Sequence, residues 1–144
     1  MKSISGKFFT TKISVEREKE DGLVKRVTEE YSVKAISFTD CEAKVTKEIG
    51  SADNIKASFE VKSEAVAAYK EVFLFDEGDI FYKVKVQEIW LDDLGNEKKN
   101  SIYYLLNATS FEQARKNIVE ALGTTLKDYT IASVIEQKTL EVIE

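Results

Sequence analysis

The feature that most constrains this chain is an internal duplication. A shift of 73 residues aligns residues 8–50 with residues 81–123 without a gap and gives nine identities in 43 positions, where unrelated sequences give roughly two or three. The identical pairs are Phe8/Phe81, Lys12/Lys85, Gly22/Gly95, Lys25/Lys98, Tyr31/Tyr104, Ala35/Ala108, Ser37/Ser110, Phe38/Phe111 and Gly50/Gly123. Neither copy can bury a core alone. We therefore expect two like repeats, residues 1–75 and 76–144, packed about a pseudo-two-fold axis into one compact domain around a single hydrophobic interior.

Each copy begins with the pattern of a β-hairpin. Apolar and polar residues alternate from residue 8 to residue 15 and again from residue 81, which is the period of a half-buried strand. Asp21-Gly22 in the first copy, and residues 93–96 in the second, predict a reversal into a second strand. The residues expected to face the core are Phe9, Thr11, Ile13, Val27, Tyr31, Val33 and Ala35, with Tyr82, Val84, Val86, Ile102, Tyr104, Leu106 and Ala108 in the second copy.

A helix follows each hairpin. Ser37 and Ser110 are suited to cap its start, and Gln113 predicts a capping box after Ser110. Gly50 and Gly123 predict left-handed caps at the helix ends. Returning strands are expected near residues 55–62 and 129–136, continued by residues 71–75 and 140–143, while residues 63–68 fit either a helical turn or a loop. The fold class is therefore α+β, a duplicated β-β-α-β unit with antiparallel sheets and one helix per repeat.

The composition removes most enzyme classes. The chain has no histidine and one cysteine, so Ser-His-Asp and Cys-His catalysis lack a residue and a zinc site would consist of carboxylates. It has neither a Walker A loop nor a GxGxxG motif. Carboxylates at residues 76–79 and 92–93 could hold a hard cation, but Asp and Gly also belong in turns. Cys41 matches Ala114 and is expected in the core. We expect a non-enzymatic protein without catalytic residues, metal or cofactor.

The charge distribution bears on partners and location. The net charge is −5, and residues 76–144 carry all of it, with 8 Lys and Arg against 13 Asp and Glu. This balance disfavours a nonspecific binder of duplex DNA but allows a local basic strip. No stretch has the apolar length of a signal peptide or a membrane helix, so we expect a cytoplasmic protein, bacterial or phage-encoded in a host, that does not bind membranes.

One strand face combines aromatic rings with lysines. If the residues named above face the core, the opposite face of the first strand exposes an identical Phe and Lys in each copy. Rings stack on bases and ammonium groups meet phosphates, which suits single-stranded nucleic acid. Alternatively, the lysines only solubilise an exposed edge. The candidate nucleic-acid-binding residues are Phe8, Lys12, Lys25, Arg26, Phe81, Lys83, Lys85, Lys98 and Lys99.

A second surface is apolar and occurs in the second copy only. Ile89, Leu91, Tyr103 and Leu105 share the outward parity, where the first copy has Glu16, Glu18, Glu30 and Ser32. An exposed apolar patch usually marks an interface, so we expect a homodimer, packing between the copies, or a protein partner here. Trp90 has inward parity and is expected in the core.

Several segments resemble a small uncharacterised family of Bacteroidota and their phages, crAss-like phages included. The resemblance is carried by residues 27–43 (VTEEYSVKAISFTDCEA), 71–73, 81–86 (FYKVKV) and 128–134 (DYTIASV), and it covers nearly the whole chain. Members often start the first strand with Trp-Phe or Trp-Tyr and have Arg-Trp-Tyr before the second copy, where this chain has Phe8-Phe9 and Ile80-Phe81-Tyr82. The resemblance implies no activity, but its members look like single-stranded DNA-binding proteins of replication or recombination. The alternative is a protein-interaction or assembly module that binds no nucleic acid.

Overall fold

The computed structural model describes residues 1–50, 59–124 and 128–144. These residues form two compact units. The five-stranded unit contains Met1–Ser5 and Tyr69–Gln137, and the four-stranded unit contains Gly6–Ala68 and Lys138–Glu144. In chain order the elements are β1 (Lys2–Ser5), β2 (Phe8–Glu18), β3 (Val24–Lys34), α1 (Phe38–Gly50), β4 (Glu60–Ala67), β5 (Tyr69–Leu74), β6 (Ile80–Leu91), β7 (Glu97–Ala108), α2 (Phe111–Leu122), β8 (Tyr129–Gln137) and β9 (Thr139–Ile143). The predicted α+β class, with one helix per repeat, is confirmed.

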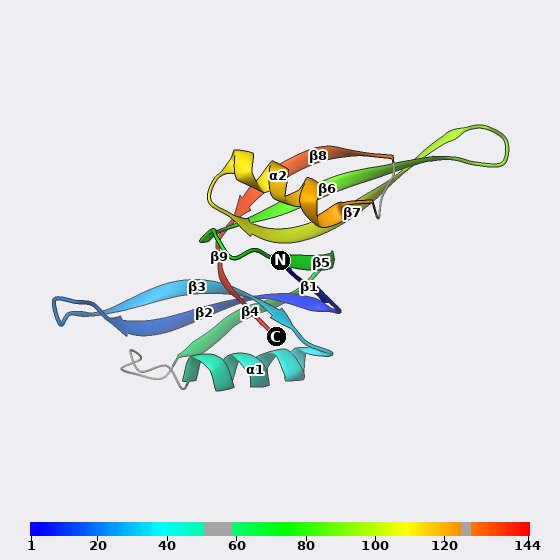
Figure 1. Ribbon diagram of the computed structural model, residues 1–144. Coiled ribbons are helices and arrows are strands. Elements are labelled where there is room, and N and C mark those ends of the chain that lie inside the picture. The colour runs from blue at the N-terminus through cyan, green and yellow to red at the C-terminus, as the bar shows by residue number, and fades with distance from the viewer. Residues whose placement is uncertain (51–58, 125–127) are drawn as a thin grey trace. The chain divides into compact units, whose positions relative to one another are not determined.

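The five-stranded unit is a sheet covered by one helix. Its strand order is β1-β5-β7-β6-β8, and α2 packs on β7, β8 and β6 (Figure 1). The amphipathic pattern of α2 explains this contact, because Ala114, Ile118 and Leu122 lie on one side of the helix and are buried. They meet the inward residues of the strands, among them Tyr82, Val84, Val86, Ile102, Tyr104 and Leu106.

The four-stranded unit repeats this plan with α1. Its strand order is β4-β2-β3-β9, and α1 packs on β3 and β9 (Figure 1). Cys41, Val45 and Ile49 form the buried stripe of the helix. The strand residues around them include Phe9, Ile13, Val15, Tyr31, Val33 and Ala35, as the alternating pattern predicts.

The strand registers show the duplication directly. Phe8 pairs with Lys34 in the first hairpin, and the same shift of 73 residues takes this pair to Phe81 and Asn107 in the second. The β2–β4 ladder slips between Lys12 and Ile13, and the β6–β8 ladder slips between the equivalent residues Lys85 and Val86. Two ladders with the same bulge at the same place are one structural unit used twice.

The last strand of each repeat lies in the other unit. β9 pairs in parallel with β3, and β5 pairs in parallel with β7. Only Ala68 separates β4 from β5, and only Lys138 separates β8 from β9. One residue is far too short for the crossover that a parallel strand in the same sheet requires. The compact units therefore divide the chain at other residues than the expected repeats, and each unit has its own core cluster.

The two serines predicted to cap the helix starts do so. Ser37 Oγ accepts from Asp40 N and Ser110 Oγ accepts from Gln113 N, each at 3.1 Å. The capping box is not completed: the Gln113 side chain donates to Asn117 Oδ1 at 2.8 Å, and among the described residues it does not accept from Ser110 N.

Of the two predicted glycine caps, the structure confirms one, and a segment predicted as a helical turn or a loop is a strand. Gly123 has φ +51° and caps α2, whereas Gly50 lies within α1 without a positive φ. Residues 63–67 belong to β4 and are neither a helical turn nor a loop, because their pairing with β2 continues to Ala67. Residues 55–58 of the expected returning strand lie outside the described residues.

Candidate nucleic-acid interface

The two phenylalanines proposed as base-stacking platforms are buried. Phe8 is 0% exposed and Phe81 is 7% exposed, so the prediction that they face solvent is wrong. Phe9 and Tyr82, their neighbours on the opposite face, are buried as well. The alternating pattern distinguishes the two faces of a strand but cannot show that both are covered at one end.

The lysines of β6 and β7 lie beside a different aromatic ring. Lys83 Nζ lies 4.7 Å from the centroid of the Tyr103 ring. Lys85 is the direct cross-strand partner of Tyr103, and Lys99 is the partner of Ile89 on the same side of the sheet. We call Lys83, Lys85, Lys99 and Tyr103 the basic face. It lies opposite the side of the sheet that α2 covers.

The basic face is nearly free of carboxylates. On β6 and β7, residues of the same parity are Phe81, Gln87, Ile89, Leu91, Glu97, Ser101, Leu105 and Asn107 besides the four named above. Glu97, at the far end, is the one acidic residue among them. Lys83, Lys85 and Tyr103 are partly exposed and Lys99 is exposed. A backbone phosphate could therefore approach three ammonium groups without meeting a carboxylate until the end of the strand.

The equivalent face of the first repeat is not basic. Lys12 is exposed but lies directly opposite Glu30. Arg26 donates to Ser14 Oγ at 2.8 Å and lies 3.6 Å from Glu16 Oε1. Lys25 is exposed and pairs with Arg17 on the other face. Of the predicted binding residues, the structure places Lys83, Lys85 and Lys99 on one face of the sheet. The aromatic ring beside them is Tyr103, which the sequence pattern assigns to the apolar interface.

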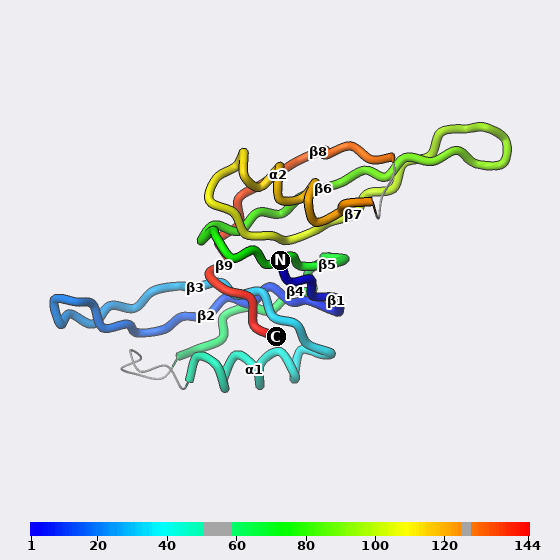
Figure 2. The backbone as a smooth tube through the Cα atoms, in the orientation of Figure 1, coloured from blue at the N-terminus to red at the C-terminus, as the bar shows by residue number. Residues whose placement is uncertain are grey.

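The proposed apolar patch is only partly present. Leu105 is 0% exposed, so its assignment to an exposed interface is wrong, whereas Leu91 is 69% exposed. Trp90, expected in the core, is 46% exposed. Its inward parity is real, but β6 and β7 run past the end of α2 (Figure 2), and the β8 ladder ends at Glu88. A residue on the helix side of the sheet has no helix above it here.

Lys98 and the residues at the tip are arranged around a turn. Asp92 Oδ1 accepts from Leu94 N at 2.9 Å and from Asn96 N at 2.8 Å. Lys98 is exposed and its Nζ lies 3.9 Å from Asp92 Oδ2. Asp92 therefore has the turn-forming role that its position before Gly95 suggests.

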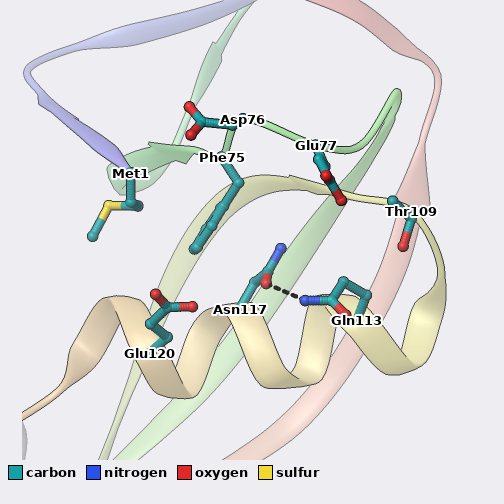
Figure 3. A pocket seen from close by; sticks show the side chains of 8 residues that line it. All are labelled: Met1, Phe75, Asp76, Glu77, Thr109, Gln113, Asn117 and Glu120. Carbon is teal, nitrogen blue, oxygen red and sulfur yellow. Dashed lines mark hydrogen bonds between the residues drawn. The ribbon is translucent and has the colours of Figure 1, made fainter.

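A polar pocket of about 350 Å³ lies between α2 and the segment that follows β5. Its lining residues are Met1, Phe75, Asp76, Glu77, Thr109, Gln113, Asn117 and Glu120 (Figure 3). The segment is fixed by Asn107, which donates to the carbonyls of Phe75 and Gly78 and accepts from Phe75 N. Three carboxylates and no Lys or Arg side chain line this pocket, so it is poorly suited to phosphate and lies outside the basic face.

The single thiol has a structural environment. Cys41 is 0% exposed and its Sγ lies 3.1 Å from Thr11 Oγ1. Burial raises the pKa of the Cys41 thiol, which disfavours the reactive thiolate. Across residues 1–50, 59–124 and 128–144, no group of three or more Cys, Asp and Glu is placed to hold a metal ion. In the same residues, neither helix has the length and apolar character that a membrane span requires.

The comparisons with known proteins identify a family but no relative of known structure or curated function. A family model described as a domain of unknown function (DUF4494) matches residues 7–144. The searches of curated proteins and of solved structures gave no match. The family match spans both repeats and both exchanged strands. The chain therefore belongs to the DUF4494 family, a domain of unknown function.

Proposed function

We propose that this protein binds single-stranded nucleic acid on the basic face of β6 and β7. The observation that carries the proposal is the Lys83 ammonium group 4.7 Å from the centroid of the Tyr103 ring, with Lys85 directly opposite that ring. An unpaired base can stack on an aromatic ring while its phosphates meet the ammonium groups beside it. Lys99, farther along the same face, extends the strip along the strand direction.

The charge of the rest of the chain favours single strands over duplex DNA. A duplex carries one phosphate charge about every 1.7 Å and needs a broad basic surface. This chain has a net charge of −5, and the second repeat itself is acidic outside the strip. Three lysines and one ring suit a few unpaired nucleotides. We expect weak, strongly salt-dependent affinity, within a role in phage or bacterial replication or recombination.

The test is a fluorescence-anisotropy titration of a labelled oligothymidylate at several salt concentrations. We expect a Kd of about 10 μM or lower at low salt, with a salt slope of roughly −0.7 for each phosphate contacted. Lys83→Gln and Lys85→Gln should each remove one phosphate contact and so reduce the magnitude of the salt slope by about 0.7. Tyr103→Leu should weaken binding by about 1 to 3 kcal/mol and leave the slope nearly unchanged, because a stacking contact releases no counterion.

The first repeat supplies matched controls. Lys12→Gln and Lys25→Gln remove exposed lysines at or near the equivalent positions, where carboxylates or Arg17 lie opposite. We expect both variants to bind like the wild type. Absence of salt-dependent binding below about 10 μM would remove the proposal, and so would an equal loss of affinity in the control variants.

A further inference from the structure

We infer that the chain self-associates head to tail, with the tip of the second hairpin of one copy seated in a groove between α2 and β8 of another copy. The seated element is the arm, defined as Trp90–Lys98, and the groove is lined by Arg115, Lys116, Val119, Glu120 and Ile131. These residues are separate from the basic face, so the inference is independent of nucleic-acid binding.

The arm carries the apolar surface that needs a partner. Leu94 is 86% exposed, Leu91 is 69% exposed and Trp90 is 46% exposed. The arm is two-stranded, since the ladder between β6 and β8 ends at Glu88. A two-stranded ribbon has marginal stability by itself. Large apolar side chains on such a ribbon are typical of an interaction site.

The groove has an apolar surface that could receive the arm. It is open, has a volume of about 430 Å³ and has a mainly apolar lining that includes Val119 and Ile131. Val119 is 51% exposed although it lies on a helix with a well-buried opposite side. Arm and groove thus present apolar surface of similar kind.

The charges of the two surfaces are opposite. Asp92, Asp93 and Glu97 place three carboxylates on the arm, against Lys98 alone. Arg115 and Lys116 place two cations on the groove, against Glu120 alone. The arm has an excess of negative charge and the groove has an excess of positive charge. Repulsion therefore disfavours a contact between two arms or between two grooves. Complementary charge therefore favours the pairing of an arm with a groove.

The arm cannot reach the groove of its own unit. β6 and β7 pair without interruption from Ile80–Ala108 to Leu91–Glu97, so the arm is a direct extension of the sheet. It runs away from α2 (Figure 2). The occupant of the groove is then the arm of a second copy. Because the two surfaces differ, the contact is heterologous, and each copy can bind one neighbour on each side.

The first hairpin lacks this combination and provides a control. Leu23 is 66% exposed at its tip, comparable with Leu91. Its strands, however, are held by Arg17 and Glu29, whose Nη2 and Oε1 atoms are 2.7 Å apart, and by the Arg26–Glu16 pair. Exposed leucine is thus present on both hairpins, but the apolar residues Trp90 and Leu91 replace Arg17 and Glu18 only in the second.

The experiment is sedimentation velocity of the full chain without nucleic acid, over a concentration range of roughly two decades. We expect the weight-average sedimentation coefficient to rise continuously with concentration. Leu91→Asp/Leu94→Asp and Val119→Asp should each weaken association at least about tenfold, with unchanged thermal unfolding because all three residues are exposed. Leu23→Asp should associate like the wild type.

Two further measurements test whether the arm of one copy contacts the groove of another. Asp93→Lys and Arg115→Asp should each weaken association, and the double variant should recover it. An equimolar mixture of Leu91→Asp/Leu94→Asp and Val119→Asp should form a one-to-one dimer and nothing larger, because one intact arm meets one intact groove.

The inference is overturned by a chain that stays monomeric throughout. It is equally overturned if the arm and groove variants associate like the wild type, if Leu23→Asp disrupts association as strongly, or if the mixture stays monomeric. Loss of oligonucleotide binding in the Lys83→Gln and Lys85→Gln variants with unchanged association would leave it intact, so the two proposals fail separately.

Discussion

Val33 of β3 and Ile143 of β9 are direct partners in a parallel pair of strands, although they come from different repeats. Leu106 of β7 and Phe73 of β5 form the equivalent pair in the other unit. Each unit therefore contains a last strand, β5 or β9, from the repeat that supplies the helix of the other unit. This exchange links the stability of both units to the two chain segments that supply β5 and β9.

Ile143 should be essential for the stability of the four-stranded unit. It is 6% exposed and belongs to the core cluster beneath α1. We expect Ile143→Ala to lower the free energy of unfolding by about 2 to 5 kcal/mol, because it leaves a cavity in a packed core. Urea unfolding measures the loss, and hydrogen exchange should show faster opening of β3. Leu140→Ala, at a 55% exposed position of the same strand, should change little.

Asn107 should be required to hold the segment after β5. Its side chain makes three hydrogen bonds to backbone groups of Phe75 and Gly78, at 2.7 to 2.9 Å. Asn107→Leu should cost about 1 to 3 kcal/mol for each backbone group left without a partner. Thermal unfolding checks this, with Asn100→Leu at an exposed position of β7 as the control. Equal stability of the two variants would contradict the role of Asn107.

Glu29 should stabilise the first hairpin through two partners. Its Oε1 accepts from Arg17 Nη2 at 2.7 Å and from Tyr31 Oη at 2.9 Å. Burial, followed by the bond to Glu29, raises the pKa of Tyr31 to about 12. Glu29→Gln should lower this pKa, although burial will keep it above the usual value of about 10. A spectrophotometric titration of the tyrosines measures the change.

The same variant should also be less stable. A hydrogen bond to a charged group contributes about 1.5 to 3 kcal/mol, and the Arg17 and Glu29 side chains are only 17% and 15% exposed. Glu16→Gln is the control, because the Glu16 and Arg26 side chains are more exposed and their charged atoms are 3.6 Å apart. A loss of stability in Glu16→Gln as large as in Glu29→Gln would contradict the prediction.

Glu64 should destabilise the folded chain at neutral pH. Its Oε1 is buried without a hydrogen-bond partner among the described residues, and burial, then the charge of Glu42, raises the pKa of Glu64. A carboxyl with a raised folded-state pKa costs stability above that pKa and ceases to do so once it is protonated. Glu64→Gln should therefore raise the melting temperature at pH 7, and the difference should shrink as the pH falls through the folded-state pKa.

Thermal unfolding between pH 4 and pH 8 tests this expectation. Glu60→Gln, in the same strand and exposed, removes a carboxylate whose ion pair with Lys62 is solvent-exposed and weak. It should change the melting temperature little at any pH. A Glu64→Gln variant that is less stable than the wild type at pH 7 would show that the ionised carboxylate stabilises the fold.

The sequence by itself determined the local structure of each repeat. The period-two alternation gave the core side of β2 and β6, Ser37 and Ser110 marked the helix starts, and the glycines at 22 and 95 marked the turns. These features depend on residues a few positions apart, so the chain specifies them wherever it folds. The shift of 73 residues also relates the pairs of the two hairpins, because equivalent residues are cross-strand partners in both.

Only the tertiary structure decided which surfaces remain exposed. Phe8 and Phe81 have the parity of surface residues and are buried, whereas Trp90 has the parity of the core and is exposed. Side-chain alternation separates two faces, but coverage depends on where α2 ends and on how far each ladder continues. The pairing of Val33 with Ile143 could not be predicted from the sequence either. The strand that pairs in parallel with β3 is determined by the path of the whole chain and not by any local pattern.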